Sequence, residues 1–236
     1  MPKSYFDFKQ FRIYHDRCAM KVGTDGVLLG AWSSTEGVNT ALDIGTGSGL
    51  VALMIAQRGV KEVVGVEIDT DAAQQAAENA AASPWSNNIR IEPTDISNFK
   101  TEKKFDLIVS NPPYFEEALR CPDNRRSAAR HADTSLNFAM LTTHARRLIK
   151  EGGRFCVIIP TTAESSFMAA CIAAHFTLVR RTAVITRSGK SPRRLLLELC
   201  QTTQTLIVTH DELILQDNNE NPRSESYTKL TSDFYL

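Results

Sequence analysis

The fold of this chain is decided by the stretch Asp43-Ile44-Gly45-Thr46-Gly47-Ser48-Gly49. It follows an apolar, β-rich run at residues 40–44 and opens a helical run at residues 49–58. Glycines at a strand-to-helix turn let the main chain approach a nucleotide ligand closely. The G-x-G-x-G spacing differs from the G-x-G-x-x-G of dinucleotide sites and does not favour a pyrophosphate. Taken alone, such a turn is also compatible with an ordinary tight connection.

Outward from this turn, β-rich and helical runs alternate along the chain. Strands are expected at 40–44, 62–67, 89–93, 105–110 and 154–160, and helices at 49–58, 71–82, 134–149 and 164–175. Two more β-rich runs, 177–186 and 194–200, are separated by a loop with Gly and Pro and predict a closing antiparallel hairpin. The pattern indicates a doubly wound α/β fold with a mostly parallel seven-stranded sheet.

The domain organisation is predicted as one core with two appendages. We expect an N-terminal appendage at 1–39, the core domain at 40–202 and a C-terminal extension at 203–236. Aromatic residues recur in the first appendage, at Phe6, Phe8, Phe11 and Tyr14. They favour a core-packed hairpin, and a stacking platform for RNA bases is the alternative.

Composition narrows the class of protein. The chain has 236 residues, 42% of them hydrophobic, and 27 basic residues balance 27 acidic ones. With no net charge, any contact with a polyanion must come from a local patch. Five scattered cysteines without C-x-x-C spacing argue against disulfides and zinc, and we expect no metal. No signal sequence or membrane span is recognisable, so a soluble, cytoplasmic protein is expected, and the oligomeric state stays open.

Acidic residues stand at the ends of three of the predicted strands, namely Asp43, Glu67 and Asp95. Glu67 ends the strand after the glycine turn, about 24 positions beyond Asp43, where ribose hydroxyls are bound in related folds. Asp95 stands where a carboxylate can accept from an adenine amino group. Asp69 has a weaker claim, because it can equally cap the next helix. The predicted adenosine site therefore comprises Asp43, Gly45, Gly47, Gly49, Glu67, Ile68, Asp95 and Ile96.

A second motif, Asn111-Pro112-Pro113-Tyr114, follows the strand at 105–110. The two prolines stiffen the loop, and the first of them pushes Asn111 into an extended conformation. The side-chain oxygen of Asn111 and the carbonyl of Pro112 can then accept from one NH2 group, and Tyr114 offers a face for stacking. The motif predicts a catalytic socket for a planar amine or amide, with an ordinary strand-ending turn as the alternative.

From Asp43 to Asn111 the chain resembles class I S-adenosylmethionine-dependent methyltransferases with an amine-methylating loop. The string from Lys21 to Trp32 is similar to one in the tRNA1(Val) (adenine-N6)-methyltransferase family, and the resemblance covers about residues 5 to 200. It implies S-adenosylmethionine as cofactor, Asn111 near that cofactor, and methylation at N6 of adenosine 37 beside a tRNA anticodon. It also implies that Thr24 and Asp25 lie against the methionine end of the cofactor, with a helix N-cap as the alternative.

Two basic clusters are candidates for tRNA phosphate contact. One follows the catalytic motif and the other surrounds the loop of the closing hairpin. Local clusters of this kind allow a neutral protein to bind RNA, although arginine runs are often only solvated surface. The predicted RNA-binding residues are Arg125, Arg126, Arg130, Lys190, Arg193 and Arg194.

Two rival functions are also compatible with this sequence. A protein glutamine N5-methyltransferase of the release-factor-modifying kind also pairs a glycine turn with Asn-Pro-Pro-Tyr. Those enzymes typically carry a separate helical N-terminal domain, whereas only about 40 residues precede the first core strand here. A non-catalytic cofactor-binding or RNA-chaperone module is the other rival, and the intact Asn111 loop argues against it.

Overall fold

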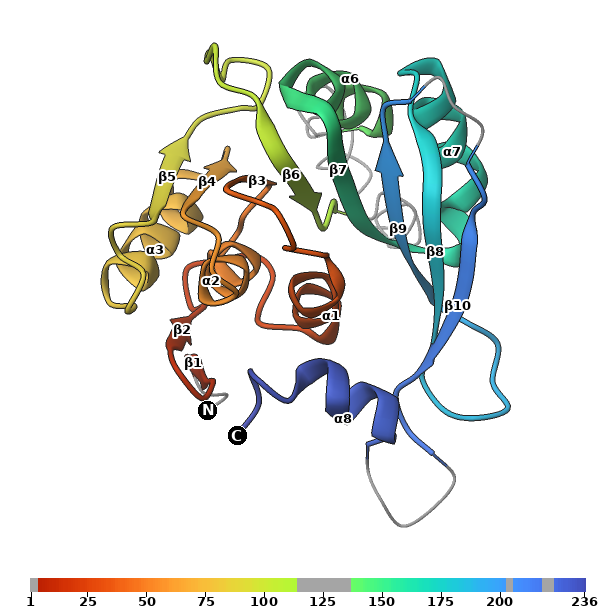
Figure 1. Ribbon diagram of the computed structural model, residues 1–236. Coiled ribbons are helices and arrows are strands. Elements are labelled where there is room, and N and C mark those ends of the chain that lie inside the picture. The colour runs from red at the N-terminus through yellow and green to blue at the C-terminus, as the bar shows by residue number, and fades with distance from the viewer. Residues whose placement is uncertain (1–3, 114–136, 203–205, 218–222) are drawn as a thin grey trace, which may run out of the picture.

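An eight-stranded sheet forms the centre of the computed structural model (Figure 1). The structure describes residues 4–113, 137–202, 206–217 and 223–236. The strands of this sheet are β3 (Thr40–Ile44), β4 (Glu62–Glu67), β5 (Ile89–Pro93), β6 (Phe105–Ser110), β7 (Ile149–Pro160), β8 (Thr177–Ile185), β9 (Arg194–Cys200) and β10 (Thr209–Ile214). Their order is β10-β8-β9-β7-β6-β3-β4-β5.

Strand direction is uniform in this sheet except for β9. The pairs β3–β4, β3–β6, β4–β5, β6–β7 and β10–β8 are parallel, whereas β9 runs antiparallel to β7 and β8. The predicted doubly wound fold and the closing hairpin are therefore confirmed. The sheet has one strand more than the seven expected, because β10 pairs with the outer side of β8.

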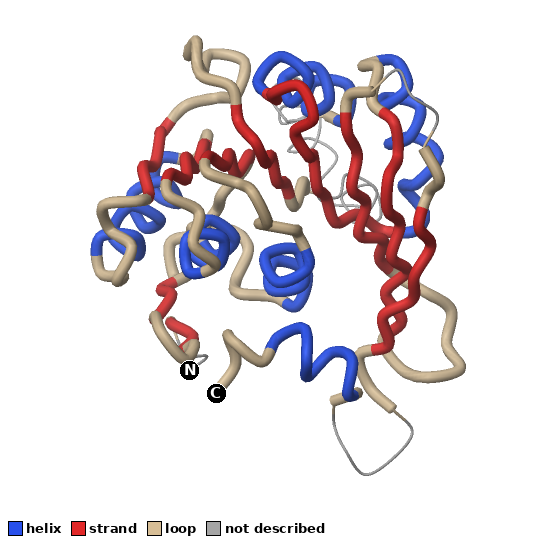
Figure 2. The backbone as a smooth tube through the Cα atoms, in the orientation of Figure 1, coloured by secondary structure: helices blue, strands red, loops and turns tan. Residues whose placement is uncertain are grey.

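Helices cover both faces of the sheet (Figure 2). One face carries α1 (Thr24–Trp32), α2 (Leu50–Gln57), α3 (Thr70–Ala81) and α8 (Glu225–Thr231), and the other carries α6 (Phe138–Leu148), α7 (Glu164–Ala173) and the short 3-10 helix η2 (Thr161–Ala163). Alternate strand residues point to opposite faces. Ala41 and Leu107 pack into the α1–α2 cluster, while their neighbours Leu42 and Ile108 pack into the α6–α7 cluster. Both faces of the sheet are thus buried, as expected for parallel strands.

The bounds of five strands match the sequence prediction, namely 40–44, 62–67, 89–93, 105–110 and 194–200. Strand β7 begins at Ile149, five residues before the predicted start, and its pairing with β6 is irregular between Phe105 and Leu107. The segment from Lys150 to Gly153 ends in a Gly-Gly pair, which is typical of a turn in sequence. In the structure it belongs to β7, with Gly152 at a positive φ of 72°.

The N-terminal hairpin consists of β1 (Tyr5–Asp7) and β2 (Arg12–Tyr14), paired antiparallel. Phe8 and Phe11 are buried and stack with ring centroids 4.7 Å apart. The N–H of Lys9 donates to the carbonyl of Phe234 (2.8 Å), so the two ends of the chain meet at the hairpin (Figure 1). The core-packed interpretation is confirmed for Phe8 and Phe11, which leave no ring face for a base.

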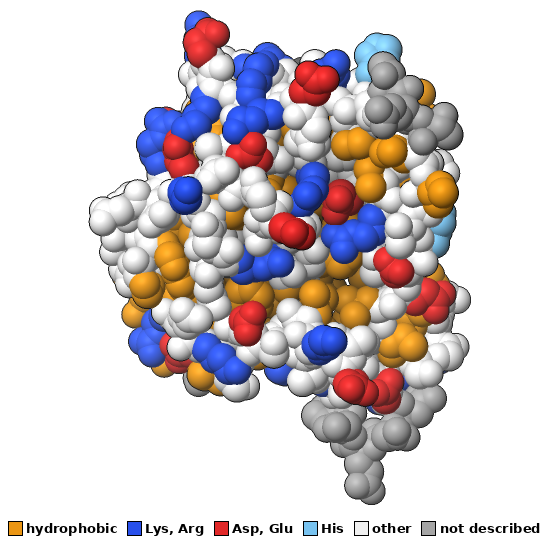
Figure 3. All heavy atoms as spheres, in the orientation of Figure 1, with side chains coloured by type: hydrophobic (Ala, Val, Ile, Leu, Met, Phe, Trp, Pro, Cys, Tyr) orange, Lys and Arg blue, Asp and Glu red, His pale blue; other side chains and the backbone are white. Residues whose placement is uncertain are grey.

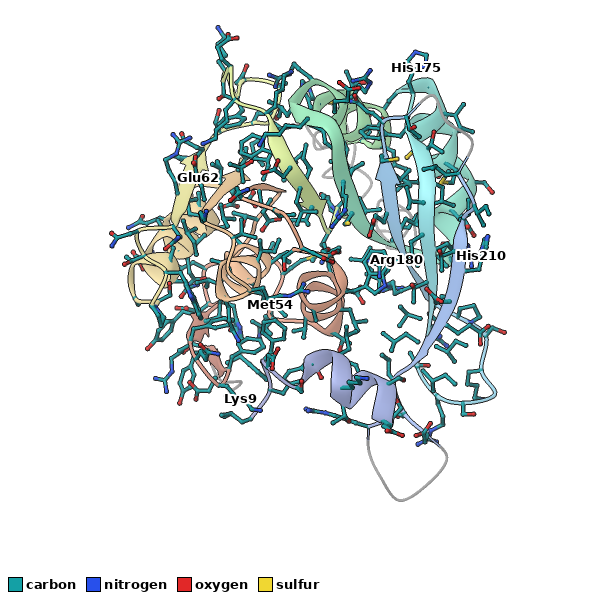
Figure 4. All side chains as sticks on the ribbon, in the orientation of Figure 1. Lys9, Met54, Glu62, His175, Arg180 and His210 are labelled. Carbon is teal, nitrogen blue, oxygen red and sulfur yellow. The ribbon has the colours of Figure 1, made fainter. Side chains whose placement is uncertain are left out.

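Helix α1 is held closely against α2 and the sheet. A Cβ added at Gly30 would lie 2.8 Å from Sδ of Met54, so only glycine permits this approach. Arg180 reaches from β8 toward α1, where its Nη2 donates to the carbonyl of Trp32 (3.1 Å) and its guanidinium lies 3.6 Å from the indole ring centroid (Figure 4). Arg58 donates to the carbonyl of Gly30 (3.0 Å). These cations satisfy carbonyls at the helix C-terminus.

Candidate active site

A cavity of about 500 Å³ opens at the carboxyl ends of β3, β4, β5 and β6. Ligands of doubly wound sheets bind at this edge because the parallel strands all end there. Its lining includes most residues of the predicted adenosine site and two of the amine-methylating motif. The residues that line it are Cys18, Ala19, Met20, Ile44, Gly45, Gly47, Val66, Glu67, Ile68, Asp69, Ala72, Thr94, Asp95, Ile96, Asn111 and Pro113.

The glycine turn forms the floor of this cavity. Gly45, Gly47 and Gly49 have φ values of 72°, 55° and 84°, a left-handed region that other residues rarely adopt. The N–H of Gly45 donates to the carbonyl of Val66 (2.9 Å), which ties the turn to β4. Gly45 and Gly47 line the cavity. Gly49 lies outside the lining as the N-cap of α2, and a Cβ there would be 3.3 Å from Cβ of Ala76.

Asp43 lies beneath the turn rather than in the cavity lining. Its Oδ2 accepts from Oγ1 of Thr46 (2.6 Å), and the side chain is almost fully buried. Burial raises the pKa of Asp43 to about 7, against the opposing effect of the Thr46 hydrogen bond. The carboxyl group therefore supports the turn from below, and direct contact with a cofactor remains a prediction.

Glu67 lines the cavity and is oriented by two backbone donors. Its Oε2 accepts from the N–H of Gly47 (2.8 Å), and its Oε1 accepts from the N–H of Asp69 (3.1 Å). A carboxylate has about four acceptor positions, so both oxygens can also accept from a diol. Asp69 caps α3 by accepting from the N–H groups of Asp71 and Ala72, both at 3.0 Å. The capping role is confirmed, and Asp69 lines the cavity as well.

An apolar slot lies next to these carboxylates. Ile96 is buried, whereas the side chain of Ile68 is 55% exposed although it lines the cavity. Asp95 is held in an Asx turn, since its Oδ1 accepts from the N–H (2.7 Å) and the Oγ (2.5 Å) of Ser97. A slot with isoleucines and one carboxylate suits a flat heteroaromatic ring that carries an amino group.

The amine-methylating motif begins at the next strand end. Oγ of Ser110, the last residue of β6, donates to the carbonyl of Ile44 (2.8 Å) and so joins the end of β6 to the end of β3. Asn111 and Pro113 consequently line the same cavity as the glycine turn. Pro112 is buried and absent from the lining, and Tyr114 falls outside the described residues.

Seven lining residues were missed by sequence reasoning. Four of them are Ile44, Val66, Ala72 and Thr94. The other three, Cys18, Ala19 and Met20, belong to the segment between β2 and α1. Burial, followed by the charges of Glu67 and Asp69, raises the pKa of the Cys18 thiol to about 11. The thiol therefore acts as a neutral wall of the cavity. No local pattern marks these residues, because their position depends on contacts with α3.

Thr24 is the first residue of α1 and is exposed, outside the cavity lining. The N-cap of α1 is Gly23, so the alternative that Thr24 or Asp25 caps this helix is wrong. Instead, Oδ2 of Asp25 accepts from Nε of Arg194 (2.8 Å). A cofactor contact of Thr24 remains a prediction.

The predicted RNA-binding residues divide into two groups. Lys190 and Arg193 are exposed in the loop between β8 and β9, at the same sheet edge as Asn111, while Arg194 is half-buried. Arg125, Arg126 and Arg130 lie outside the described residues. On the face that carries α1, α2 and α8, basic and acidic side chains are intermixed (Figure 3), in line with the balanced composition.

Neither a metal-binding cluster nor a membrane-spanning helix is present in the part of the chain that the structure describes. There, no group of three or more His, Cys, Asp or Glu side chains is placed to hold a metal ion. Nor does any helix within the described ranges have the length and apolarity needed to cross a membrane.

Two solved structures show the fold: the predicted O-methyltransferase Atu636 of Agrobacterium tumefaciens has a TM-score of 0.68 at 20% identity and covers 89% of this chain and 96% of its own. The glycopeptide N-methyltransferase MtfA, solved with S-adenosyl-L-methionine, has a TM-score of 0.56 at 13% identity. The match covers 77% of this chain and 100% of the MtfA chain.

Sequence relatives are much closer. A tRNA1(Val) (adenine(37)-N6)-methyltransferase of Phocaeicola vulgatus is 47% identical over 236 residues, or 100% of this chain and 99% of the relative. A second relative of the same name, from Escherichia coli O157:H7, is 45% identical over 235 residues, which are 98% of this chain and 94% of the relative. The model of the methyltransferase small domain matches residues 22–186. The chain therefore belongs to the methyltransferase small domain family and, within it, to the tRNA1(Val) (adenine(37)-N6)-methyltransferases.

Proposed function

We propose that this protein transfers a methyl group from S-adenosylmethionine to N6 of adenosine 37 in tRNA1(Val). The observation that carries the proposal is a single cavity that joins the glycine turn, Glu67, Asp95 and Asn111 in a chain matching its relatives from end to end. Because the substrate is a tRNA, the proposed reaction takes place in the cytoplasm.

The adenosine part of the cofactor fits the part of the cavity between the ends of β4 and β5. Glu67 lines the cavity and would accept from the ribose hydroxyls, because its two oxygens are already held in place by the N–H groups of Gly47 and Asp69. Ile68 and Ile96 would enclose the adenine ring, and Asp95 would accept from its amino group. A volume of about 500 Å³ lies within the usual range for cofactor sites.

The methyl acceptor fits the Asn111 side of the cavity. The lone pair of an adenine N6 is delocalised into the ring, so the amine is a poor nucleophile until its hydrogens are held by acceptors. Oδ1 of Asn111 and the carbonyl of Pro112 would supply these acceptors and orient the nitrogen for in-line attack. The sulfonium of the cofactor supplies the electrophilic methyl group, so the protein needs to supply only orientation and electrostatics.

The anticodon region of the tRNA would approach along the carboxyl edge of the sheet. Lys190 and Arg193 are exposed there, and Arg125, Arg126 and Arg130 follow the catalytic motif in sequence. Adenosine 37 must leave its stack to reach Asn111, which costs less in a loop than in a duplex. Tyr114 would then stack on the extruded base.

Product identification tests the proposal. The protein is incubated with methyl-labelled S-adenosylmethionine and tRNA1(Val) transcript, and the RNA is digested and analysed by mass spectrometry. We expect the label in N6-methyladenosine at position 37 and none in a transcript with guanosine 37. Label in a glutamine side chain of an added protein extract, with unlabelled RNA, would instead establish a protein glutamine methyltransferase.

A further inference from the structure

Two buried amide side chains on α3 face the chain segment that forms one wall of the cavity. We call this segment, residues 14–20, the N-terminal strap. Gln75 and Asn79 are 1% and 2% exposed, and their i, i+4 spacing places them on one face of α3. Buried amides require partners for their donors and acceptors, and both find these partners in the strap.

Gln75 binds three consecutive strap residues. Its Nε2 donates to Oδ1 of Asp16 (2.7 Å). Its Oε1 accepts from the N–H of Arg17 (3.1 Å) and from Sγ of Cys18 (3.1 Å). The strap backbone is therefore fixed directly before Ala19 and Met20, which line the cavity beside Cys18.

Asn79 connects the strap to the glycine turn. Its Oδ1 accepts from the N–H of Tyr14 (2.9 Å), and its Nδ2 donates to the carbonyl of Tyr14 (2.8 Å). The same Nδ2 also donates to the carbonyl of Ser48 (2.9 Å). One amide group thus holds both the start of the strap and the turn that forms the cavity floor.

We propose that Gln75 and Asn79 are positioning residues for cofactor binding, which hold the strap so that Cys18, Ala19 and Met20 close one side of the cavity. The inference rests on the proposed function in that the cavity binds S-adenosylmethionine. Neither amide lines the cavity, so both act through the strap. Asn111 is held at the end of β6, where Ser110 binds the carbonyl of Ile44, and not by the strap hydrogen bonds of Gln75 and Asn79. Loss of the strap should therefore weaken cofactor binding more than it disturbs the methyl-acceptor side.

The first variant is Gln75→Leu, which removes the hydrogen bonds of the amide and fills the buried site with an apolar side chain of similar size. We expect the Kd for S-adenosylhomocysteine, measured by calorimetry, to rise roughly tenfold, the effect of about 1.4 kcal/mol. With saturating S-adenosylmethionine, kcat and the KM for tRNA should stay within about twofold of wild type. Asp16→Ala removes one of the bonds from the strap side and should raise the Kd about fivefold.

A rescue separates positioning from general stability. Gln75→Glu replaces the donor to Asp16 with a carboxylate and should weaken binding, whereas Gln75→Glu with Asp16→Asn exchanges donor and acceptor and should restore it. Gln74→Leu, on the exposed side of α3, is the matched control. Thr231→Val, a buried polar change in α8, controls for a lowered Tm.

An unchanged Kd in both Gln75→Leu and Asp16→Ala would overturn the positioning role, even if the Tm fell. Equal Kd changes in Gln75→Leu and Thr231→Val would do the same, because a general loss of stability would then explain the effect. Failure of the wild-type protein to bind S-adenosylhomocysteine would contradict the proposed function instead, so the two failures are distinguishable.

Discussion

Asp25 and Arg194, 169 residues apart in sequence, form an ion pair with 2.8 Å between Oδ2 and Nε. The pair joins the first turn of α1 to the first residue of β9, and its side chains are 26% and 29% exposed. It therefore fixes the start of α1 at the sheet edge where the cavity opens. The guanidinium that the sequence assigns to RNA thus already has a carboxylate partner.

This ion pair should contribute measurable coupling to stability. Asp25→Asn and Arg194→Gln should each lower the free energy of unfolding by about 1 kcal/mol, and the double variant should lose little more than either one. Urea denaturation of the four proteins gives the coupling energy. Strict additivity would show that the pair does not form in solution.

The exposed basic residues of the neighbouring loop should behave differently. Lys190→Gln and Arg193→Gln should raise the KM for tRNA, and each should reduce the slope of log KM against log salt by about 1 if it contacts one phosphate. The control is Lys61→Gln, which makes the same change of charge. Lys61 is exposed directly before β4, at the amino ends of the parallel strands. Variants that changed kcat alone would speak against phosphate contact.

Removal of the Asn111 side chain should reduce methyl transfer severely and spare cofactor binding. Asn111→Ala loses one of the two acceptors proposed for the amine, and we expect kcat to fall by about 100-fold or more. The Kd for S-adenosylhomocysteine should change less than about threefold by calorimetry. Asn98→Ala, an exposed asparagine, is the control. A loss of cofactor binding equal to the loss of activity would refute the acceptor role.

Glu67 should act on cofactor affinity itself. Glu67→Ala removes the proposed acceptor for the ribose and the partner of the Gly47 N–H, so the Kd should rise at least about tenfold. Asp71→Ala, an exposed acidic change in the first turn of α3, serves as the comparison. An unaltered Kd in Glu67→Ala would remove Glu67 from the site.

Asp43 should make stability fall as the pH rises. Its folded-state pKa of about 7 lies above the ordinary value of 3.8, so the folded state retains a proton that the unfolded chain releases. Between about pH 4 and pH 7 the free energy of unfolding of the wild type should therefore fall relative to that of Asp43→Asn. At about 1.4 kcal/mol per pKa unit, the expected fall is about 2–4 kcal/mol. Urea denaturation at a series of pH values across this range measures the difference. A constant difference would mean that Asp43 is ionised throughout.

Sequence alone located the elements whose signals are local. The apolar run Val63-Val64-Gly65-Val66 and the alanine-rich run beginning at Asp71 correspond closely to β4 and α3. Strand β10 was missed because Thr209-His210-Asp211-Glu212 is polar and exposed, as an edge strand permits. The early start of β7 was missed because Gly152 and Gly153 resemble a turn.

The site shows the same contrast between local and tertiary signals. Glu67, Asp95 and Asn111 were found because strand ends converge at one edge of a parallel sheet. Asp43 also stands at a strand end, but its side chain is buried below the glycine turn, where it accepts a hydrogen bond from Thr46. This burial depends on tertiary packing and cannot be read from the motif. Met20 was not assigned to the cavity, because contacts between α3 and residues far earlier in the chain decide its place.

Strand β10 also bears on how the molecule behaves at high concentration. The outer edge of a sheet presents unpaired backbone groups that can recruit a second sheet. In β10 the exposed residues His210, Asp211 and Glu212 occupy the middle of that edge. Two such edges brought together would oppose acidic side chains, so the strand that completes the sheet also discourages its growth into aggregates.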